Sequence, residues 1–232
     1  MAAAPRRPGA NARRVREELL SEMLRYMDAD EAGGFERCAR DLQTVLAARG
    51  RLADRWVMVA YSGGKDSSLA VAYVRMLQLF LARETGETFS LRVATYRHPG
   101  VPTGAIQNID RVYTALRMYE DPQAEMLILD ENEVELFDRS RPAPELVRSW
   151  ARRDILMVGH LTLGDARPVF CNACNIGYAG SLVAAASYEN FNADVFVTGD
   201  SKREMSDYCK WVGRLAEELG IEGRYRGFRG YQ

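Results

Sequence analysis

The stretch over 56–80 constrains the fold of this chain more than any other. A short apolar run, Trp56 to Tyr61, stops at Gly63-Gly64, and the segment 69–80 then shows the apolar spacing of a helix. Glycines at such a turn let the backbone come close to a ligand, and the helix that follows presents free N–H groups and the positive end of its dipole. The sequence therefore predicts a strand, an anion-binding glycine loop and a helix.

The alternation of strand-like and helical segments continues along the chain. We expect further strands at 89–95, 126–129 and 194–198, and helices at 103–119 and 177–188. Strands that alternate with helices form a parallel sheet covered on both faces. The predicted fold class is therefore α/β, a doubly wound parallel sheet with helices on both faces. The stretch 130–168 contains a polar, proline-bearing break and predicts no definite element.

The first 50 residues are expected to form helices. Apolar side chains recur at helical spacing on both sides of Gly33-Gly34, where we expect a break; they are Val15, Leu19, Leu20, Met23, Leu24, Leu42, Val45 and Leu46. We interpret residues 1–50 as an N-terminal helical extension packed on a domain that spans residues 51–232.

Each polar side chain of the glycine loop is suited to a chemical task. The hydroxyls of Ser62, Ser67 and Ser68 can donate hydrogen bonds to phosphate oxygens. Lys65 can neutralise charge on departing pyrophosphate, and Asp66 can hold a magnesium ion. The lysine directly follows the glycine pair, so the loop differs from the G-x-x-x-x-G-K-[ST] and G-x-G-x-x-G loops. The alternative is a serine-glycine turn that only caps a helix.

The six residues Ser62-Gly63-Gly64-Lys65-Asp66-Ser67 resemble the SGGKDS form of the PP-loop in ATP pyrophosphatases of the adenine nucleotide alpha-hydrolase type. Families with this pattern include tRNA thiolases, NAD and GMP synthetases, the lysidine synthetase, nucleobase-modifying synthases and sugar amidotransferases. The resemblance implies a Rossmann-like (HUP-type) fold. It also implies ATP and magnesium as cofactors, and adenylation of a substrate with release of pyrophosphate.

A second polar segment follows the strand predicted at 194–198. It begins Gly199-Asp200-Ser201-Lys202, and we expect it to face the glycine loop because ligands bind at the carboxyl ends of strands in such sheets. The resemblance implies that Gly199, Asp200 and Lys202 contact phosphates or magnesium, with Asp200 also a catalytic candidate. It likewise places adenine near Tyr96, at the end of the second strand. The alternative is a charged helix start capped by Asp200.

Cys171 and Cys174 form a C-x-x-C pair at the start of the helix predicted over 177–188. A helix N-terminus favours the reactive thiolate. Three functions fit the pair: a persulfide or disulfide relay, ligation of an iron-sulfur cluster, or half of a zinc site. Two inert thiols are the alternative. The placement of the pair resembles that in tRNA thiolases and sugar amidotransferases, whereas Cys38 is assigned to the helical core.

The charge balance limits the choice of partners. A formal net charge of −1 produces no global positive field that would draw the chain to nucleic acid or an acidic membrane. We find no secretory signal and no run near the about 18 apolar residues of a membrane span, so we expect a cytoplasmic protein. The expected partners are a small molecule or tRNA, a sulfur- or ammonia-donor protein, and a second copy of the chain.

Three functions follow from these features. The leading hypothesis is adenylation of a substrate carbonyl oxygen followed by sulfur transfer, with Lys65, Asp66, Cys171, Cys174 and Asp200 as catalytic residues. The second keeps the adenylation and replaces sulfur by ammonia. The third is a non-catalytic ATP-binding subunit, which the intact polar residues of the loop disfavour.

Overall fold

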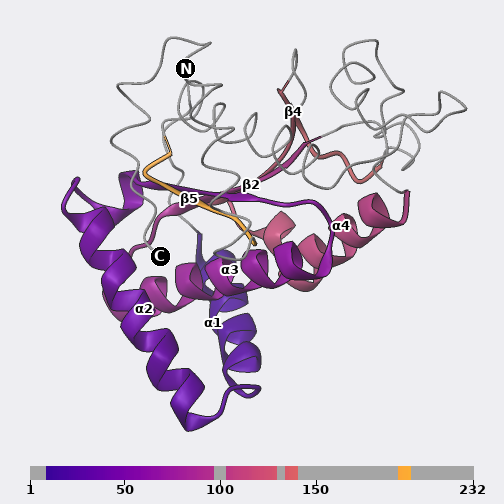
Figure 1. Ribbon diagram of the computed structural model, residues 1–232. Coiled ribbons are helices and arrows are strands. Elements are labelled where there is room, and N and C mark those ends of the chain that lie inside the picture. The colour runs from indigo at the N-terminus through magenta and orange to yellow at the C-terminus, as the bar shows by residue number, and fades with distance from the viewer. Residues whose placement is uncertain (1–8, 97–102, 130–133, 141–192, 200–232) are drawn as a thin grey trace, which may run out of the picture.

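A computed structural model describes residues 9–96, 103–129, 134–140 and 193–199 of the chain (Figure 1). The helices are α1 (Ala10–Leu24), α2 (Ala29–Ala47), α3 (Lys65–Thr85) and α4 (Thr103–Ala115), with 3-10 turns η1 (Leu52–Asp54) and η2 (Met118–Glu120). The strands are β1 (Trp56–Ala60), β2 (Ser90–Tyr96), β3 (Ala124–Leu129), β4 (Val134–Leu136) and β5 (Val195–Val197). Within these ranges we find no helix with the length and apolar character needed to span a membrane.

The strands form one sheet in the order β4-β3-β2-β1-β5. β1 pairs in parallel with β2 on one side and with β5 on the other, and β2 pairs in parallel with β3. The chain therefore starts in the middle of the sheet and later adds a strand on the opposite side of β1. This order confirms the α/β doubly wound, Rossmann-like prediction. β4, which pairs antiparallel with β3, was not predicted.

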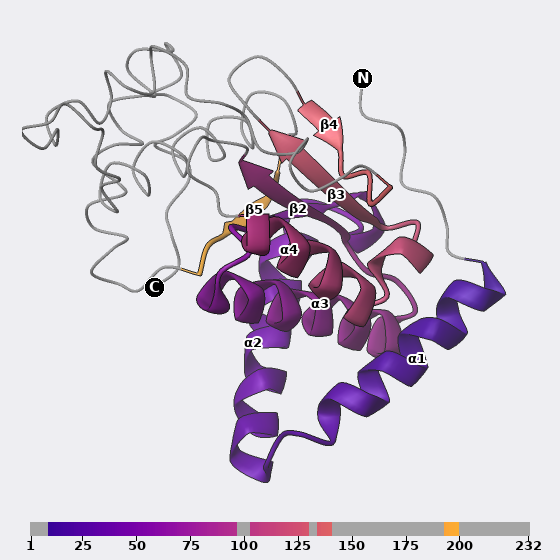
Figure 2. The ribbon, with the colours of Figure 1, turned by 90° about the vertical axis from the view of Figure 1, so that its right-hand side faces the viewer.

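The described helices all lie on one side of the sheet (Figures 1 and 2). Val57 and Val59 of β1 point into the core that these helices cover, whereas Met58 points to the opposite face with Ala94 and Leu127. This alternation is the period of two expected for a strand buried on both faces. The helix predicted over 177–188 lies outside the described residues, so its cover of the second face stays a prediction.

The N-terminal helices differ from the prediction in where they break. α2 runs through Gly33 and Gly34, and the actual break lies over 25–28. Asp28 accepts hydrogen bonds from the N–H groups of Asp30 and Glu31, both at 2.9 Å, and Glu31 accepts one in return from the N–H of Asp28. Such a cap contributes about 1 kcal/mol, which offsets the cost of one of the two helical glycines, each roughly 1 kcal/mol.

The boundaries of two other helices also differ from those predicted from the sequence. α3 begins at Lys65, directly after the glycine loop and before the predicted start at residue 69. α4 ends at Ala115 instead of residue 119, because Arg117 adopts a left-handed conformation with φ 50. A single residue in that conformation interrupts the helical hydrogen-bond pattern, and η2 follows.

Asp194 joins the start of β5 to the start of β1. Its carboxylate accepts a hydrogen bond from the N–H of Trp56 at 2.9 Å, and its own N–H donates to the carbonyl of Trp56 at 2.8 Å. Arg55 pairs with the same carboxylate at 3.4 Å. These contacts hold the two strands in register where the parallel pairing begins.

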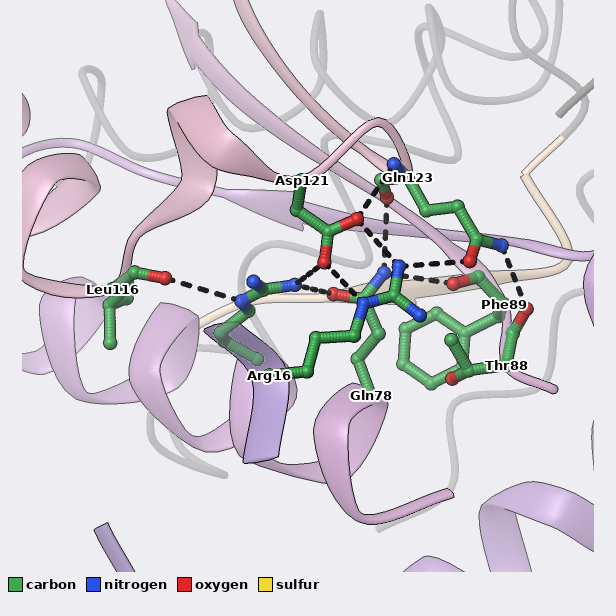
Figure 3. A network of polar contacts seen from close by, with 8 residues as sticks. Arg16, Gln78, Thr88, Phe89, Leu116, Asp121 and Gln123 are labelled. Atoms are coloured by element: carbon green, nitrogen blue, oxygen red, sulfur yellow. Dashed lines mark hydrogen bonds and ion pairs between the residues drawn. The ribbon is translucent and has the colours of Figure 1, made fainter. Parts of the chain in front are cut away.

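A buried polar network attaches α1 to the rest of the fold (Figure 3). The Asp121 carboxylate accepts from Nε of Arg16 at 2.7 Å and from Nη1 of Arg75 at 2.8 Å. Gln78 accepts from Arg75 at 2.6 Å and donates to the carbonyl of Phe89 at 2.9 Å. All three charged side chains are buried, so each arginine needs the Asp121 carboxylate, and the carboxylate needs the arginines, to offset the loss of water. The network therefore fixes α1 against α3 and the approach to β3.

We predict that Asp121 makes folding sensitive to acid. Burial acts to raise the pKa of Asp121, but hydrogen bonds from Arg16 and the charges of Arg75 and Arg16 outweigh it and lower the pKa from 3.8 to about 2. A lowered carboxylate pKa contributes stability that is present above the unfolded value and is lost as the pH falls through the folded value. Urea unfolding should show about 2 kcal/mol of unfolding free energy lost between about pH 4 and pH 2 from this group.

The variant Asp121→Asn tests the same contribution. Because it leaves two buried arginines without a counter-charge, we expect it to lower the free energy of unfolding by about 3 to 5 kcal/mol near neutral pH. The acid dependence due to Asp121 should then disappear. Arg14→Ala is the control, since Arg14 pairs with Glu18 at the surface and should contribute less than about 1 kcal/mol. An Asp121→Asn variant that loses stability in acid as steeply as the wild type contradicts the assignment.

Candidate functional site

The glycine loop lies between β1 and α3, next to the place where the strand order reverses. Gly63 has φ 77, and a Cβ placed on it would lie 2.6 Å from the carbonyl oxygen of Ala105 in α4. Only glycine tolerates both this left-handed conformation and this close approach. The first turn of α4 therefore packs directly against the backbone of the loop.

Gly199 reaches the loop from the other side. It follows β5, and a Cβ placed on it would lie 2.8 Å from the carbonyl carbon of Asp66 and 2.8 Å from the nitrogen of Ser67. The structure thus brings the glycine loop and Gly199 together at the carboxyl ends of adjacent parallel strands. In open α/β sheets this position, beside the reversal of strand order, is where ligands bind.

The other predicted site residues divide into two groups. Tyr96 is the last residue of β2, so its backbone lies at the same edge of the sheet as the loop. Asp200, Lys202, Cys171 and Cys174 lie outside the described residues. Their assignments stay predictions. Cys38 is half-buried on α2 and packs against the core, as expected.

The loop hydroxyls differ in their hydrogen-bond partners. Ser62 Oγ is 3.0 Å from Ser67 Oγ, and the Ser62 side chain is exposed. Ser68 Oγ instead donates to the carbonyl of Gly64 at 2.7 Å and lies 3.1 Å from the hydroxyl of Tyr61. Ser67 Oγ also donates to this carbonyl, at the longer distance of 3.2 Å. The exposed hydroxyl of Ser62, paired with that of Ser67, is therefore placed to contact a ligand, whereas the hydroxyl of Ser68, which the sequence also suggested as a phosphate ligand, is engaged by Gly64 and Tyr61.

The N-terminus of α3 supplies backbone donors at the same place. Gly64, the N-cap residue, has extended backbone and no side chain of its own to cap the helix. The first backbone amide that bonds within the helix is that of Ser68, which donates to the carbonyl of Gly64 at 2.9 Å. The preceding N–H groups and the helix dipole favour an anion, and Lys65 and Asp66 extend from this first turn with exposed side chains.

The donor set at this turn fits a magnesium ion that is shared with phosphates. Among the residues that the structure describes, no cluster of three or more His, Cys, Asp or Glu could hold a metal by itself. Magnesium, however, commonly binds through one or two carboxylates together with substrate phosphates and water. The exposed carboxylate of Asp66, next to free backbone donors for phosphate, provides such an arrangement.

Two residues of the site were missed by sequence reasoning. Asn108 of α4 donates through Nδ2 to the carbonyl of Gly63 at 2.8 Å, and Tyr61 reaches Ser68 from the end of β1. Asn108 stands 45 positions from its partner in the chain, and no spacing rule connects the two. Tyr61 reads in sequence as the last apolar residue of a strand. Neither residue carries a signal that could have revealed its role.

Comparison with known proteins adds little. No family model matches the chain, and no curated protein matches its sequence. Among solved structures, NAD+ synthetase from Burkholderia pseudomallei matches with 19% identity and a TM-score of 0.36, over 90% of this chain and 76% of that chain. A likeness at that TM-score carries no statement about function, so the function rests on the residues of the site.

We predict that Gly199→Ala disturbs the loop. The new methyl group would overlap the backbone of Asp66 and Ser67, so those residues must shift, at an expected cost of about 1 to 3 kcal/mol in unfolding free energy. Gly104→Ala is the matched control, because a Cβ there meets nothing within 4 Å and alanine favours a helix by up to about 1 kcal/mol. Urea unfolding and the amide NMR shifts of Asp66 and Ser67 measure both effects. Unchanged shifts and stability in Gly199→Ala contradict the packing described.

Proposed function

We propose that this chain is an ATP pyrophosphatase that adenylates a substrate carbonyl oxygen and releases pyrophosphate. The observation that carries the proposal is the junction of the SGGKDS loop, the N-terminus of α3 and Gly199 at the reversal of strand order. It combines free backbone donors with a cation, Lys65, and a carboxylate, Asp66, on one turn. A simple helix cap does not require a close approach of a third segment at Gly199.

The proposed adenylation uses these groups in distinct roles. The substrate oxygen attacks the α-phosphorus of ATP, and the bond from that phosphorus to the pyrophosphate oxygen breaks. Lys65 offsets the charge that grows on pyrophosphate, while the hydroxyls of Ser62 and Ser67 and the free N–H groups of α3 bind phosphate oxygens. Asp66 would hold magnesium, which neutralises phosphate charge when bound. Asp200 and Lys202, which follow Gly199 in the sequence, are proposed as further ligands of phosphate or metal.

For the second half-reaction we propose sulfur transfer. Adenylation turns the carbonyl oxygen into a good leaving group, and a sulfur nucleophile then attacks the carbon that bears this oxygen and displaces AMP. If the nucleophile is a persulfide on one cysteine, the thiol of the other cysteine would break the S–S bond, release the thiolated product and leave a disulfide that an external thiol reductant reduces. The C-x-x-C pair Cys171 and Cys174 supports sulfur as the nucleophile, through a persulfide or an iron-sulfur cluster. The substrate is a tRNA base or a small molecule, and a donor protein supplies sulfur. The alternative is that ammonia replaces sulfur as the nucleophile and gives an amidated product. The cysteine experiment below distinguishes the two alternatives.

Lys65→Ala should weaken nucleotide binding and leave folding intact. Loss of one charge-assisted contact to phosphate predicts an increase of about 10- to 100-fold in the Kd for ATP with magnesium, measured by calorimetry. Because Lys65 is exposed, the free energy of unfolding should not change. Arg83→Ala, at the other end of α3, is the control and should bind ATP like the wild type.

The products of ATP distinguish this proposal from its competitors. With bulk tRNA or a metabolite extract as the source of substrate, ³¹P NMR should show AMP and pyrophosphate, and labelled pyrophosphate should exchange into ATP. Both signals should fall by about 10²- to 10³-fold in Lys65→Ala. Formation of ADP and phosphate contradicts adenylation, and ATP binding without any turnover supports a non-catalytic subunit.

The cysteine pair decides between sulfur and ammonia. We expect protein purified without air to show either the visible absorption of a thiolate-ligated cluster or a persulfide that alkylating reagents trap. Cys171→Ala and Cys174→Ala should remove that signal, and Cys38→Ala, at a half-buried position on α2, should keep it. Stoichiometric zinc that both variants lose, or thiols that carry neither sulfur nor metal, would favour amidation.

A further inference from the structure

We propose that Asn108 is a positioning residue for the glycine loop. Its side chain orients the peptide between Gly63 and Gly64 so that the N–H of Gly64 points toward bound phosphate. This inference rests on the proposed function and goes beyond it, because Asn108 belongs to α4 and lies outside the loop that carries the resemblance. It would act through the loop backbone and not through contact with reacting atoms.

The loop peptide is held by α4 in two ways. Asn108 is half-buried and donates through Nδ2 to the carbonyl of Gly63 at 2.8 Å. Since a carbonyl oxygen only accepts, the amide must present its NH₂ group at this contact. Ala105, one turn earlier on α4, lies against Gly63 so closely that no side chain fits between them. The carbonyl of Gly63 therefore accepts from Asn108, while the Cα of the same residue lies against the backbone of Ala105.

This contact determines which way an amide of the loop points. In a planar trans peptide the C=O and the N–H point to opposite sides. Because the carbonyl of Gly63 faces Asn108, the N–H of Gly64 faces away from α4. There it donates a long hydrogen bond to Ser62 Oγ at 3.4 Å, and Ser62 Oγ in turn lies 3.0 Å from Ser67 Oγ. The amide thus joins the donors proposed to bind phosphate.

Two adjacent glycines make such an anchor necessary. Glycine enters left- and right-handed conformations with similar ease, so the peptide between Gly63 and Gly64 can turn over at low cost. A turned peptide would present its carbonyl oxygen to the phosphate, and the partial negative charge of that oxygen would repel the phosphate anion. The hydrogen bond from Asn108 selects the orientation that presents the N–H.

Tyr61 and Ser68 hold the next carbonyl from the same inner side. Ser68 has a single hydroxyl proton, which it donates to the carbonyl of Gly64 at 2.7 Å, so at the 3.1 Å contact the hydroxyl of Tyr61 is the donor. Burial raises the pKa of Tyr61 above its ordinary value, against the smaller lowering effect of the bond to Ser68, and this keeps the donor protonated. Asn108 also lies 3.5 Å from Ser68 Oγ, which links the two anchors.

The test compares phosphate-bearing and phosphate-free probes. Asn108→Leu keeps the size of the side chain and removes its donor, and Asn108→Gln restores an amide. Calorimetry with ATP and magnesium, with inorganic pyrophosphate and with adenosine should show about tenfold weaker binding of the first two by Asn108→Leu. Adenosine binding should stay unchanged, and Asn108→Gln should recover part of the loss.

Tyr119→Phe is the matched control. The substitution removes the 2.7 Å hydrogen bond from Tyr119 in η2 to Asp110, which lies on α4 as Asn108 does. It changes no contact of the glycine loop. It should cost a similar amount of stability, about 1 kcal/mol, and leave all three affinities unchanged. If Asn108→Leu weakens adenosine as much as pyrophosphate, or binds all probes like the wild type, the positioning role is wrong.

An additional measurement separates this inference from the proposed function. In the nucleotide-free protein, hydrogen exchange at the Gly64 amide should be faster in Asn108→Leu than in the wild type and in Tyr119→Phe. Unchanged exchange overturns the orienting role even if the chain binds ATP. A wild type that binds neither ATP nor pyrophosphate overturns the proposed function, and with it the role of Asn108 in phosphate binding. The hydrogen-exchange result would still show whether Asn108 anchors the loop peptide.

Discussion

The left-handed conformation of Gly63 is the constraint on which the site depends. It lets the chain leave the central strand β1 and enter α3 within a few residues, while α4 packs at backbone distance on the same turn. Gly199 meets that turn from β5 with equally little room. Three segments from distant parts of the chain therefore converge at backbone distance, because Gly63 and Gly199 have no side chain. The first turn of α3, with its backbone amides and the exposed side chains of Lys65 and Asp66, remains as the surface proposed to meet a ligand.

Local patterns were sufficient for the central part of the fold. The apolar runs around Val59, Val93 and Ile128 predicted three strands of a parallel sheet, which the structure pairs as neighbours. The glycine pair predicted the turn from strand to helix. The break assigned to Gly33-Gly34 was wrong because a capping box at Asp28 starts the helix upstream, and the packing of Phe35 against Tyr73 and Phe80 supports it. Tertiary contacts of this kind outweigh the modest helix propensity of glycine.

The features that sequence could not reveal are those that join distant residues. The ion pair of Arg16 with Asp121 spans 105 positions, and in the sequence Arg16 is one of several N-terminal arginines with no feature that indicates burial. Asn108 similarly occupies an ordinary position on an amphipathic helix. Periodicity reports which face of a helix is buried, but it does not report which polar atom on that face meets a partner. The loop was therefore predictable, and its supports were not.

The hydrogen bonds between Asp194 and Trp56 have a consequence for the order in which the strands pair during folding. It connects residues 138 positions apart, whereas β1, α3 and β2 are contiguous in the chain. Closing a long loop costs more entropy than forming local contacts, so pairing of β5 with β1 is favoured to follow the assembly of the N-terminal half. During synthesis the glycine turn can form well before Gly199 emerges. The proposed nucleotide site would then be completed only when β5 docks beside β1.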